Sequence, residues 1–492
     1  MTDVLKRQSY IGIEKEKVLE HLIKIFGKPN VTDKNYNLIA YSYDMTESPP
    51  RMPDFVVLPK KVEEIIQLVN FCNQYCIPIV PYVSGNNVGG LTIPEEGGII
   101  CDMGKRMKKI VKINESLMYI ILEPGVTFGQ LKKFLDDHHP NLKYGYAMAP
   151  PYASVLANAL LSGISNLSTK MGSMGDMING LEVVLYNGEL IRTGTSFLSK
   201  EMKDDNWFAR YPMPDLTGLF IGWQGTTGIV TKGALQLWSR KKYNAALMGI
   251  IYTAENCANV LQEFGRSECC EDVCSISAEL AKMVWGFEKP QKLKEEPDYI
   301  VMVSLSGATK ELLQAKINYL RQIFNELKEK AENKRMFLVN FDTFINIVGK
   351  EFAVYYNIPN VLTPLYEWDG LTWVGSYAHP DRIAKLMNTV YGLYKKYEMG
   401  PMIYSKSMKG GHYSVLRPMV RFQKVREEEK VKKMMHEILE VMLEENCVPY
   451  KAPSWMTEII RKKCDPNWVK LLERIKCTMD PNHIFNPGKW GL

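Results

Sequence analysis

Apolar residues along the chain alternate between helical spacing and the spacing of short strands. Residues 13–27 carry apolar side chains at helical intervals and stop at Gly27, which predicts a first helix with a glycine C-cap. Residues 54–60, 62–75 and 77–83 predict a strand, a helix and a second strand. This order is a β-α-β unit, and the glycine-rich stretch PYVSGNNVGG (81–90) follows its second strand.

The apolar pattern and the glycine content both change near residue 242. Glycine is frequent before this point, and after it helices and strands alternate with few glycines. Residues 117–139 predict strands, a turn and a helix, and residues 181–194 predict a hairpin whose Asn187-Gly188 suits a two-residue turn. Beyond residue 242, amphipathic helices alternate with strands. We therefore expect an α+β fold with boundaries at residues 1–242, 243–445 and 446–492, the last segment returning to the first.

Composition narrows the class of protein. The 492 residues hold 61 Lys and Arg against 55 Asp and Glu, and the net charge of +6 has no long basic run, so no nucleic-acid partner is expected. The first residues are charged where a secretory signal needs an apolar core, and no apolar window is long enough to span a membrane. A cytoplasmic protein is expected.

The ten cysteines do not have the paired spacing of zinc or iron-sulfur ligands. We expect thiols, and no metal site. Cys269, Cys270 and Cys274 leave a metal or redox cluster as the alternative reading.

The stretch 81–90 places bare backbone directly after a strand. Consecutive backbone N–H groups form a concave nest that suits phosphate oxygens, and glycine allows close approach. The spacing of Gly85, Gly89 and Gly90 matches neither the GxGxxG nor the Walker pattern. Taken alone, the stretch fits either a diphosphate loop or a plain surface loop.

A set of stretches in one order resembles the FAD-binding domain of the vanillyl-alcohol oxidase / p-cresol methylhydroxylase (PCMH-type) flavoprotein family. They are VSGNNVGG (83–90), IICDMGKRMKKIVKINE (99–115), LEPGVTFGQL (122–131), PPYASVLANALLSG (150–163), MGSMGDMINGLEVVLYNGELIRTG (171–194), GLFIGWQGTTGIVTK (218–232) and DPNHIFNPGK (480–489). The middle of the chain resembles the family by position only, which implies an α/β cap domain with an antiparallel sheet over the substrate. The resemblance implies an FAD-dependent oxidoreductase. Since no histidine lies in the 83–90 loop, we expect non-covalent FAD.

The resemblance also implies the residues that contact the cofactor. They are Ser84, Gly85, Asn86, Asn87, Val88 and Gly89 around the diphosphate, Ser154, Asn158, Gly172, Ser173, Gly175 and Asp176 along the cradle and the flavin, Ile229 and Val230 near the adenine or ribose, and Asn486 and Lys489 in the closing tail. For Asp176, a carboxylate that accepts hydrogen bonds from loop N–H groups is the structural alternative. For Lys489, the alternative is an exposed side chain.

Tyr450 and Lys451, in CVPYKAPSWM, fall where phenol-oxidising members of the family carry a Tyr-Arg pair that stabilises a phenolate. A cation beside a phenol donor suits an anionic oxygen. Two positions depart from that pattern, because the family's loop tyrosine falls at Val88 and its aspartate at Ser173. Lysine is also not equivalent to a bidentate arginine. The phenolate clamp is therefore incomplete.

Three functions follow from these residues. We favour oxidation of a small phenolic or other alcohol by hydride transfer to flavin N5, with electrons passed to O2 or to a protein acceptor. The alternative is a D-2-hydroxy-acid dehydrogenase of the lactate or glycolate type. The chain lacks the HxxGDGNxH and EHG patterns of the metal-dependent enzymes, but His412 with Arg417 and Arg421 would hold a carboxylate. A structural role is the other reading of His412.

A hypothesis of another class is a non-catalytic electron-transfer subunit, motivated by the residues at positions 88 and 173. We also expect a small-molecule substrate and a homo-oligomer.

Overall fold

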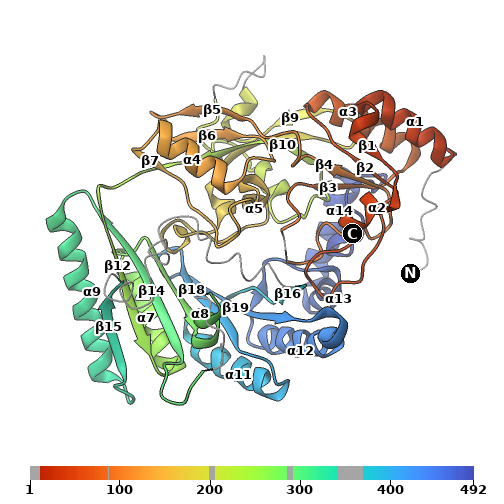
Figure 1. Ribbon diagram of the computed structural model, residues 1–492. Helices are drawn as coiled ribbons and strands as arrows, with labels where there is room; N and C mark the ends of the chain where they lie inside the picture. Colours follow the sequence, from red (N-terminus) through yellow and green to blue (C-terminus); the bar gives the residue numbers. More distant parts are fainter. Residues whose placement is uncertain (1–11, 87, 199–205, 285–291, 342–368) are drawn as a thin grey trace.

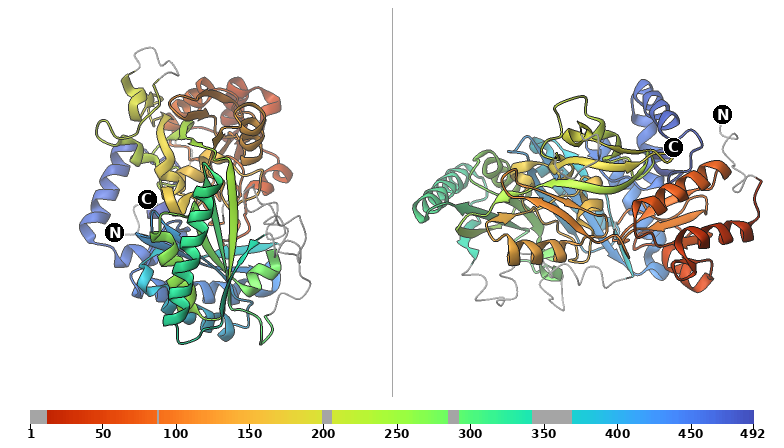
Figure 2. Two further views of the ribbon diagram at one scale, coloured as in Figure 1. Left: turned by 90° about the vertical axis from the view of Figure 1, so that its left-hand side faces the viewer. Right: turned by 90° about the horizontal axis from the view of Figure 1, so that it is seen from above.

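The computed structural model describes residues 12–86, 88–198, 206–284, 292–341 and 369–492. Figure 1 shows the red-to-yellow first half of the chain above the green-to-blue second half. Two further views show the same arrangement from the side and from above (Figure 2). Within the described ranges, no helix has the length and apolarity needed to cross a membrane.

The predicted β-α-β unit is present in the first sheet. Its strands are β1 (Val31–Thr32), β2 (Phe55–Val57), β4 (Ile99–Asp102) and β3 (Ile79–Tyr82), in that order across the sheet. The helix between the two predicted strands is α3 (Val62–Tyr75), and β4 lies between β2 and β3, parallel to both. The predicted first helix is α1 (Lys15–Phe26), which ends at Gly27 with φ of 78°. Its apolar face packs with that of α3.

The second sheet is antiparallel and lies beside the first. Its strands are, in spatial order, β5 (Ile110–Asn114), β6 (Tyr119–Leu122), β10 (Ile229–Gln236), β8 (Ile178–Val184) and β9 (Leu190–Arg192). The predicted hairpin is β8 and β9, with Gly188 at φ of 78° in its turn. A separate pair joins β7 (Leu142–Lys143) to β11 (Trp238–Ser239).

Short helices connect the strands of the first half. They are α2 (Asn35–Leu38), α4 (Phe128–His138), α5 (Val155–Leu160) and α6 (Ser168–Met171). The predicted helix at 153–163 is thus only six residues long, because Ser154 caps its start and Ser162 has a positive φ just past its end.

The strands described after residue 242 form one antiparallel sheet, as predicted. The order is β15 (Met336–Asn340), β12 (Tyr243–Ile251), β14 (Tyr299–Gly307), β13 (Asp272–Ser277), β18 (Met402–Met408), β19 (Tyr413–Phe422), β17 (Ser376–Ala378) and β20 (Val448–Pro449), with β16 (Gly370–Trp373) also paired to β19. Its helices are α7 (Ala254–Arg266), α8 (Ala278–Val284), α9 (Lys310–Lys330), α11 (Ile383–Lys396) and α12 (Lys424–Glu444).

The two faces of this sheet have different neighbours. Val301 and Val303 pack in one core cluster with α7, α9, α11 and α12. Met302, between them, faces the opposite way and packs in a cluster with Met419 and with Val88 of the glycine-rich loop. Because side chains alternate along a strand, the second face of the sheet is turned toward the first half of the chain.

The last segment contains α13 (Ser454–Lys463) and α14 (Pro466–Met479) and then returns to the first sheet. Phe485 forms a parallel bridge with Ile79 in β3, and the N–H of Ile79 donates to Ile484 over 2.7 Å. In Figure 1 the C-terminus accordingly lies among the red N-terminal elements. The division into three parts stays a prediction, although no described strand of one sheet crosses residue 242 into another.

Candidate functional site

A large cleft lies between the glycine-rich loop, α5, the turn before β10 and the second-half sheet. The empty space between its walls is about 1350 Å³, a volume that includes open solvent. Its walls include Ser84 from the loop, Asn158 from α5, Trp373 and Arg417 from the sheet, and Lys451.

The glycine-rich loop bends sharply where it enters the cleft. Ser84, Gly85 and Asn86 line the cleft, as predicted for a diphosphate loop. Gly85 has φ of 63°, and a Cβ at this position would overlap the hydroxyl group of Tyr82. Glycine is therefore required there by both backbone conformation and space. Asn87, also predicted to contact the cofactor, lies outside the described residues.

Ser154 joins α5 to the loop. Its hydroxyl accepts a hydrogen bond from the N–H of Ala157 over 3.0 Å and donates to the carbonyl of Pro124 over 2.6 Å, while its own N–H donates to Ser84 over 3.3 Å. The hydroxyl is thus used as a helix cap, and Ser154 lines the cleft while it fixes two of its walls.

Four amide side chains around the cleft each bury an oxygen atom without a hydrogen-bond partner among the described residues. They are Asn86, Asn158, Gln224 and Asn486, and all four line the cleft. A buried unpaired acceptor costs about 1–3 kcal/mol, so such groups are normally satisfied by a ligand or water. FAD carries hydroxyl and N–H donors along its length. The residues present therefore fit that cofactor, and Gln224 lines the cleft although the sequence alone did not indicate it.

The predicted group from 172 to 176 lies behind the wall of the cleft. Gly172, with φ of 89°, ends α6. The carboxylate of Asp176 accepts hydrogen bonds from the N–H and the hydroxyl of Ser173 over 2.9 and 3.0 Å, and the carbonyl of Gly175 accepts one from Arg210 over 3.0 Å. Among the described residues, none of the four predicted in this group lines the cleft. The geometry matches the structural alternative for Asp176.

The remaining predicted cofactor residues divide between the cleft and the core. Val230 lines the cleft, whereas Ile229 points into the core of the first sheet. Val88 and Gly89 are buried, and Val88 packs against the second-half sheet. The position of the family's loop tyrosine is thus an apolar contact here.

The two predicted residues of the tail have different surroundings. Asn486 lines the cleft and donates to the carbonyl of Gln224 over 2.7 Å. The side chain of Lys489 is 1% exposed and its ammonium contacts Glu95 and the carbonyl of Gly90, each over 2.8 Å. It therefore neither lines the cleft nor lies exposed.

Arg417, Tyr450 and Lys451 meet at the wall of the cleft that the second-half sheet forms. The Nε of Arg417 donates to the hydroxyl oxygen of Tyr450 over 3.0 Å, and its Nη2 contacts the same oxygen. Both Arg417 and Lys451 line the cleft, while Tyr450 is held behind them and stacks on Tyr377 with ring centroids 5.3 Å apart. Burial, and to a smaller extent the positive charge of Arg417, lowers the pKa of Lys451 to about 7. No described residue accepts a hydrogen bond from its ammonium group.

Two further polar side chains, which the sequence did not indicate, lie beside Arg417. The guanidinium of Arg417 lies 5.0 Å from the ring centroid of Trp373 and 5.4 Å from that of Tyr404. The indole N–H of Trp373 and the hydroxyl of Tyr404 are both buried, and neither has a partner in the described part of the chain. Tyr404 is directly opposite Arg417 in the register of β18 and β19. Only that pairing, which is not local in sequence, reveals the cluster.

His412 is not part of this cluster. Residue 412 belongs to the exposed turn between β18 and β19, since β19 begins at Tyr413. It borders a separate surface hollow with Arg266 and Asp381. The structure therefore does not support the catalytic role predicted for His412. Arg421 is on the same strand as Arg417 but does not line the cleft among the described residues.

Two protein-family models match segments of the chain that contribute residues to this cleft. Residues 53–194 match the FAD binding domain model, and residues 455–490 match the model for the C-terminal domain of FAD linked oxidases. The chain is an FAD-dependent oxidoreductase with a PCMH-type FAD domain. The first match contains the glycine-rich loop and α5, and the second contains the tail with Asn486.

This oxidoreductase has relatives of several kinds. It is 27% identical over 489 residues, 96% of each chain, to a glycolate oxidase subunit of Bacillus subtilis. It is 30% identical over 212 residues, 42% of this chain and 34% of the relative, to the mitochondrial D-lactate dehydrogenase [cytochrome] of Arabidopsis thaliana. The crystal structure of p-cresol methylhydroxylase with bound substrate has the same fold, with a TM-score of 0.84, 21% identity and coverage of 97% of this chain and 96% of that chain.

The residues that line the cleft also bear on how this flavoprotein holds FAD. Among those described, none is a histidine, tyrosine or cysteine, the side chains to which a flavin is bonded in covalent flavoproteins. No disulfide bond joins any of the ten cysteines, and the described residues contain no group of side chains arranged to hold a metal ion. Non-covalent FAD stays a prediction.

Proposed function

We propose that this FAD-dependent oxidoreductase oxidises a small 2-hydroxy carboxylate to the corresponding 2-oxo acid. The observation that carries the proposal is the group of donors at the cleft wall, where Arg417 and Lys451 supply positive charge and Trp373 supplies an unpaired buried donor. The unpaired hydroxyl of Tyr404 belongs to a ring that lies against Arg417. Preorganised donors of this kind bind a carboxylate strongly, because charge-assisted hydrogen bonds are about twice as strong as neutral ones.

Each residue of the cluster has a separate part in this proposal. Arg417 holds the substrate anion, since a guanidinium stays protonated at all ordinary pH values. Lys451 adds a second cation, which no described residue neutralises. Trp373 orients the bound group through its N–H donor, and Tyr404, which does not line the cleft, lies against the guanidinium of Arg417. Bound FAD supplies the two-electron acceptor that the oxidation needs. Cationic side chains take the place of the metal ion used by the metal-dependent hydroxy-acid enzymes.

The full-length relative supports the same substrate class, since it is named as a subunit of glycolate oxidase. The residues at positions 88 and 173 support it as well. Val88 is packed in an apolar cluster and Ser173 is bound to Asp176, so neither supplies a phenol-specific contact.

Phenol oxidation is the second candidate, and the pairing of Arg417 with the Tyr450 hydroxyl favours it. A tyrosine held by an arginine presents a donor to a phenolate as readily as to a carboxylate. The partly buried donors around Arg417 argue against a non-catalytic electron-transfer subunit, because groups without a ligand would carry an unrelieved desolvation cost. We further propose that electrons pass to a protein acceptor or to O2, since one relative is named for a cytochrome.

Anaerobic reduction of the bound flavin distinguishes the candidates. The purified protein is mixed with glycolate, D-lactate and a longer D-2-hydroxy acid, with the matching 2-hydroxy amides as neutral controls, and with 4-hydroxybenzyl alcohol. We expect the flavin absorbance to be lost with the acids and at least about tenfold more slowly with the amides. Loss with 4-hydroxybenzyl alcohol and with none of the acids would establish the phenol candidate instead.

A variant series tests the cluster itself. Lys451→Met should raise KM for the acid by about 10- to 100-fold, because one charged hydrogen bond contributes roughly 1.5–3 kcal/mol. Lys462→Met is the matched control, since Lys462 is exposed on α13 and, among the described residues, pairs with Glu458 alone. An unchanged KM in Lys451→Met would remove Lys451 from the site.

A further inference from the structure

The C-terminal residues 484–492 contact two separate walls of the cofactor cleft. Lys489 contacts the carbonyl of Gly90 at the end of the glycine-rich loop. Asn486 donates to the carbonyl of Leu91 over 3.2 Å and to the carbonyl of Gln224 over 2.7 Å. Trp490 donates from its indole N–H to the carbonyl of Gly222 over 2.8 Å. The tail therefore joins the loop to the turn before β10.

Both the N–H and the carbonyl group of Gly90 form hydrogen bonds to residues outside the loop. Its N–H donates to Asp44 over 2.7 Å, and its carbonyl accepts from Lys489 over 2.8 Å. The residue has φ of 62°, and a Cβ would press against Ser48. The shape of the loop at this point is set by contacts to distant residues and not by the loop alone.

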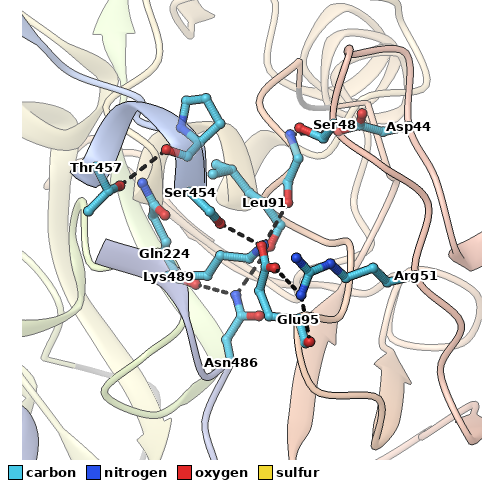
Figure 3. Close-up of polar contacts among 12 residues, drawn as sticks. Asp44, Ser48, Arg51, Leu91, Glu95, Gln224, Ser454, Thr457, Asn486 and Lys489 are labelled. Atoms are coloured by element: carbon cyan, nitrogen blue, oxygen red, sulfur yellow. Dashed lines mark hydrogen bonds and ion pairs between the residues drawn. The ribbon is translucent and has the colours of Figure 1, made fainter. Parts of the chain in front are cut away.

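Glu95 connects Lys489 of the tail to Ser454, which lies in the segment 451–454 beside the cleft. Its carboxylate accepts from Lys489, from the hydroxyl of Ser454 over 2.5 Å and from Arg51 over 2.8 Å (Figure 3). Burial alone would raise the pKa of Glu95, but Lys489, Ser454 and Arg51 lower it overall, so the group is ionised. Ser454 follows Lys451 by three residues, and Gln224 donates to the carbonyl of Ala452 over 3.0 Å.

We propose that the tail is a clasp for FAD, in which Lys489 and Asn486 are positioning residues that hold the glycine-rich loop, the turn at 222–225 and the segment 451–454 in the shape that binds the cofactor. Lys489 does not touch the cleft, so it acts through Gly90 and Glu95. Asn486 acts through Leu91 and Gln224 and also turns an unpaired amide oxygen to the cleft. This role is independent of which substrate the enzyme oxidises.

The test measures FAD binding and stability separately. Lys489→Met retains the length of the side chain and removes its charge, and Lys489→Arg retains the charge. We expect Lys489→Met to raise the dissociation constant of FAD, followed by flavin fluorescence, by about 10- to 100-fold. The melting temperature of the FAD-bound form should fall more than that of the apo form, because weaker ligand binding gives less stabilisation. Lys489→Arg should restore much of the affinity, and Lys462→Met is the control.

Equal falls in the melting temperatures of the apo and FAD-bound forms, with an unchanged dissociation constant, would show that Lys489 is only structural and would overturn the proposal. Should Lys489→Met fail to fold, hydrogen exchange of the unmodified protein decides the question. The clasp requires that residues 484–492 and 88–95 become protected together when FAD is added to the apo protein. Protection of 88–95 with no change at 484–492 would also overturn it.

Discussion

Arg417 donates to the hydroxyl oxygen of Tyr450 over 3.0 Å, and a second nitrogen of the same guanidinium contacts that oxygen. Because Arg417 fills the acceptor capacity of this oxygen, the proton of the Tyr450 hydroxyl is available to an acceptor elsewhere. We expect this arginine and this tyrosine, 33 residues apart in the sequence, to act together on an anion.

Removal of the hydroxyl group in Tyr450→Phe should raise KM for the substrate anion by about tenfold, because Arg417 loses the partner that orients it. Steady-state kinetics measure the change. Tyr377→Phe is the control, since Tyr377 stacks on Tyr450. Equal effects of the two substitutions would indicate a general loss of packing.

Substrate binding should depend on pH through Lys451. Burial and Arg417 lower its pKa to about 7, so the side chain is a cation below that pH and neutral above it. KM for an anionic substrate should therefore rise as pH increases through about 7. Lys451→Arg should abolish this rise, because arginine remains protonated. A KM profile that keeps the same inflection in Lys451→Arg would assign it to another group.

Tyr404→Phe should separate stability from substrate binding. The hydroxyl group is buried without a partner, so its removal should increase the free energy of unfolding by about 1 kcal/mol while it weakens substrate binding. Tyr394→Phe is the matched control, because the Tyr394 hydroxyl donates to the carbonyls of Met402 and Met419 and its loss should destabilise the protein. Denaturant unfolding and KM measure the two effects.

Gly85→Ala should yield protein with little bound FAD. A side chain at φ of 63° costs about 1–2 kcal/mol, and the added Cβ would also displace Tyr82. The ratio of flavin to protein absorbance reports the loss. In Gly392→Ala, within α11, the added Cβ meets no atom within 4 Å, so this variant should keep its FAD and be slightly more stable. Full FAD content in Gly85→Ala would contradict the expectation.

The local parts of the fold were predictable from sequence because each has its own periodicity. The first helix, the β-α-β unit, the hairpin at Asn187-Gly188 and the long antiparallel strands all appear in the structure. The short length of α5 was not predictable, since Ser162 just past its end takes a positive φ that its apolar pattern does not reveal.

The site was predictable only in part. Ser84, Asn158 and Lys451 line the cleft as expected, because they lie in stretches that resemble the family. His412 was misplaced because one residue separates the turn from the strand. Tyr404 could not be found from sequence, since its position beside Arg417 depends on the register of two strands.

The contact between Lys489 and Gly90 joins residues 399 positions apart. During synthesis on the ribosome, the first sheet and its glycine-rich loop emerge long before the tail exists. The loop therefore lacks one of its two supports until translation is complete. We therefore expect the loop to reach its final geometry only once the tail has been synthesised, and a chain that lacks the tail to bind FAD more weakly than the full chain.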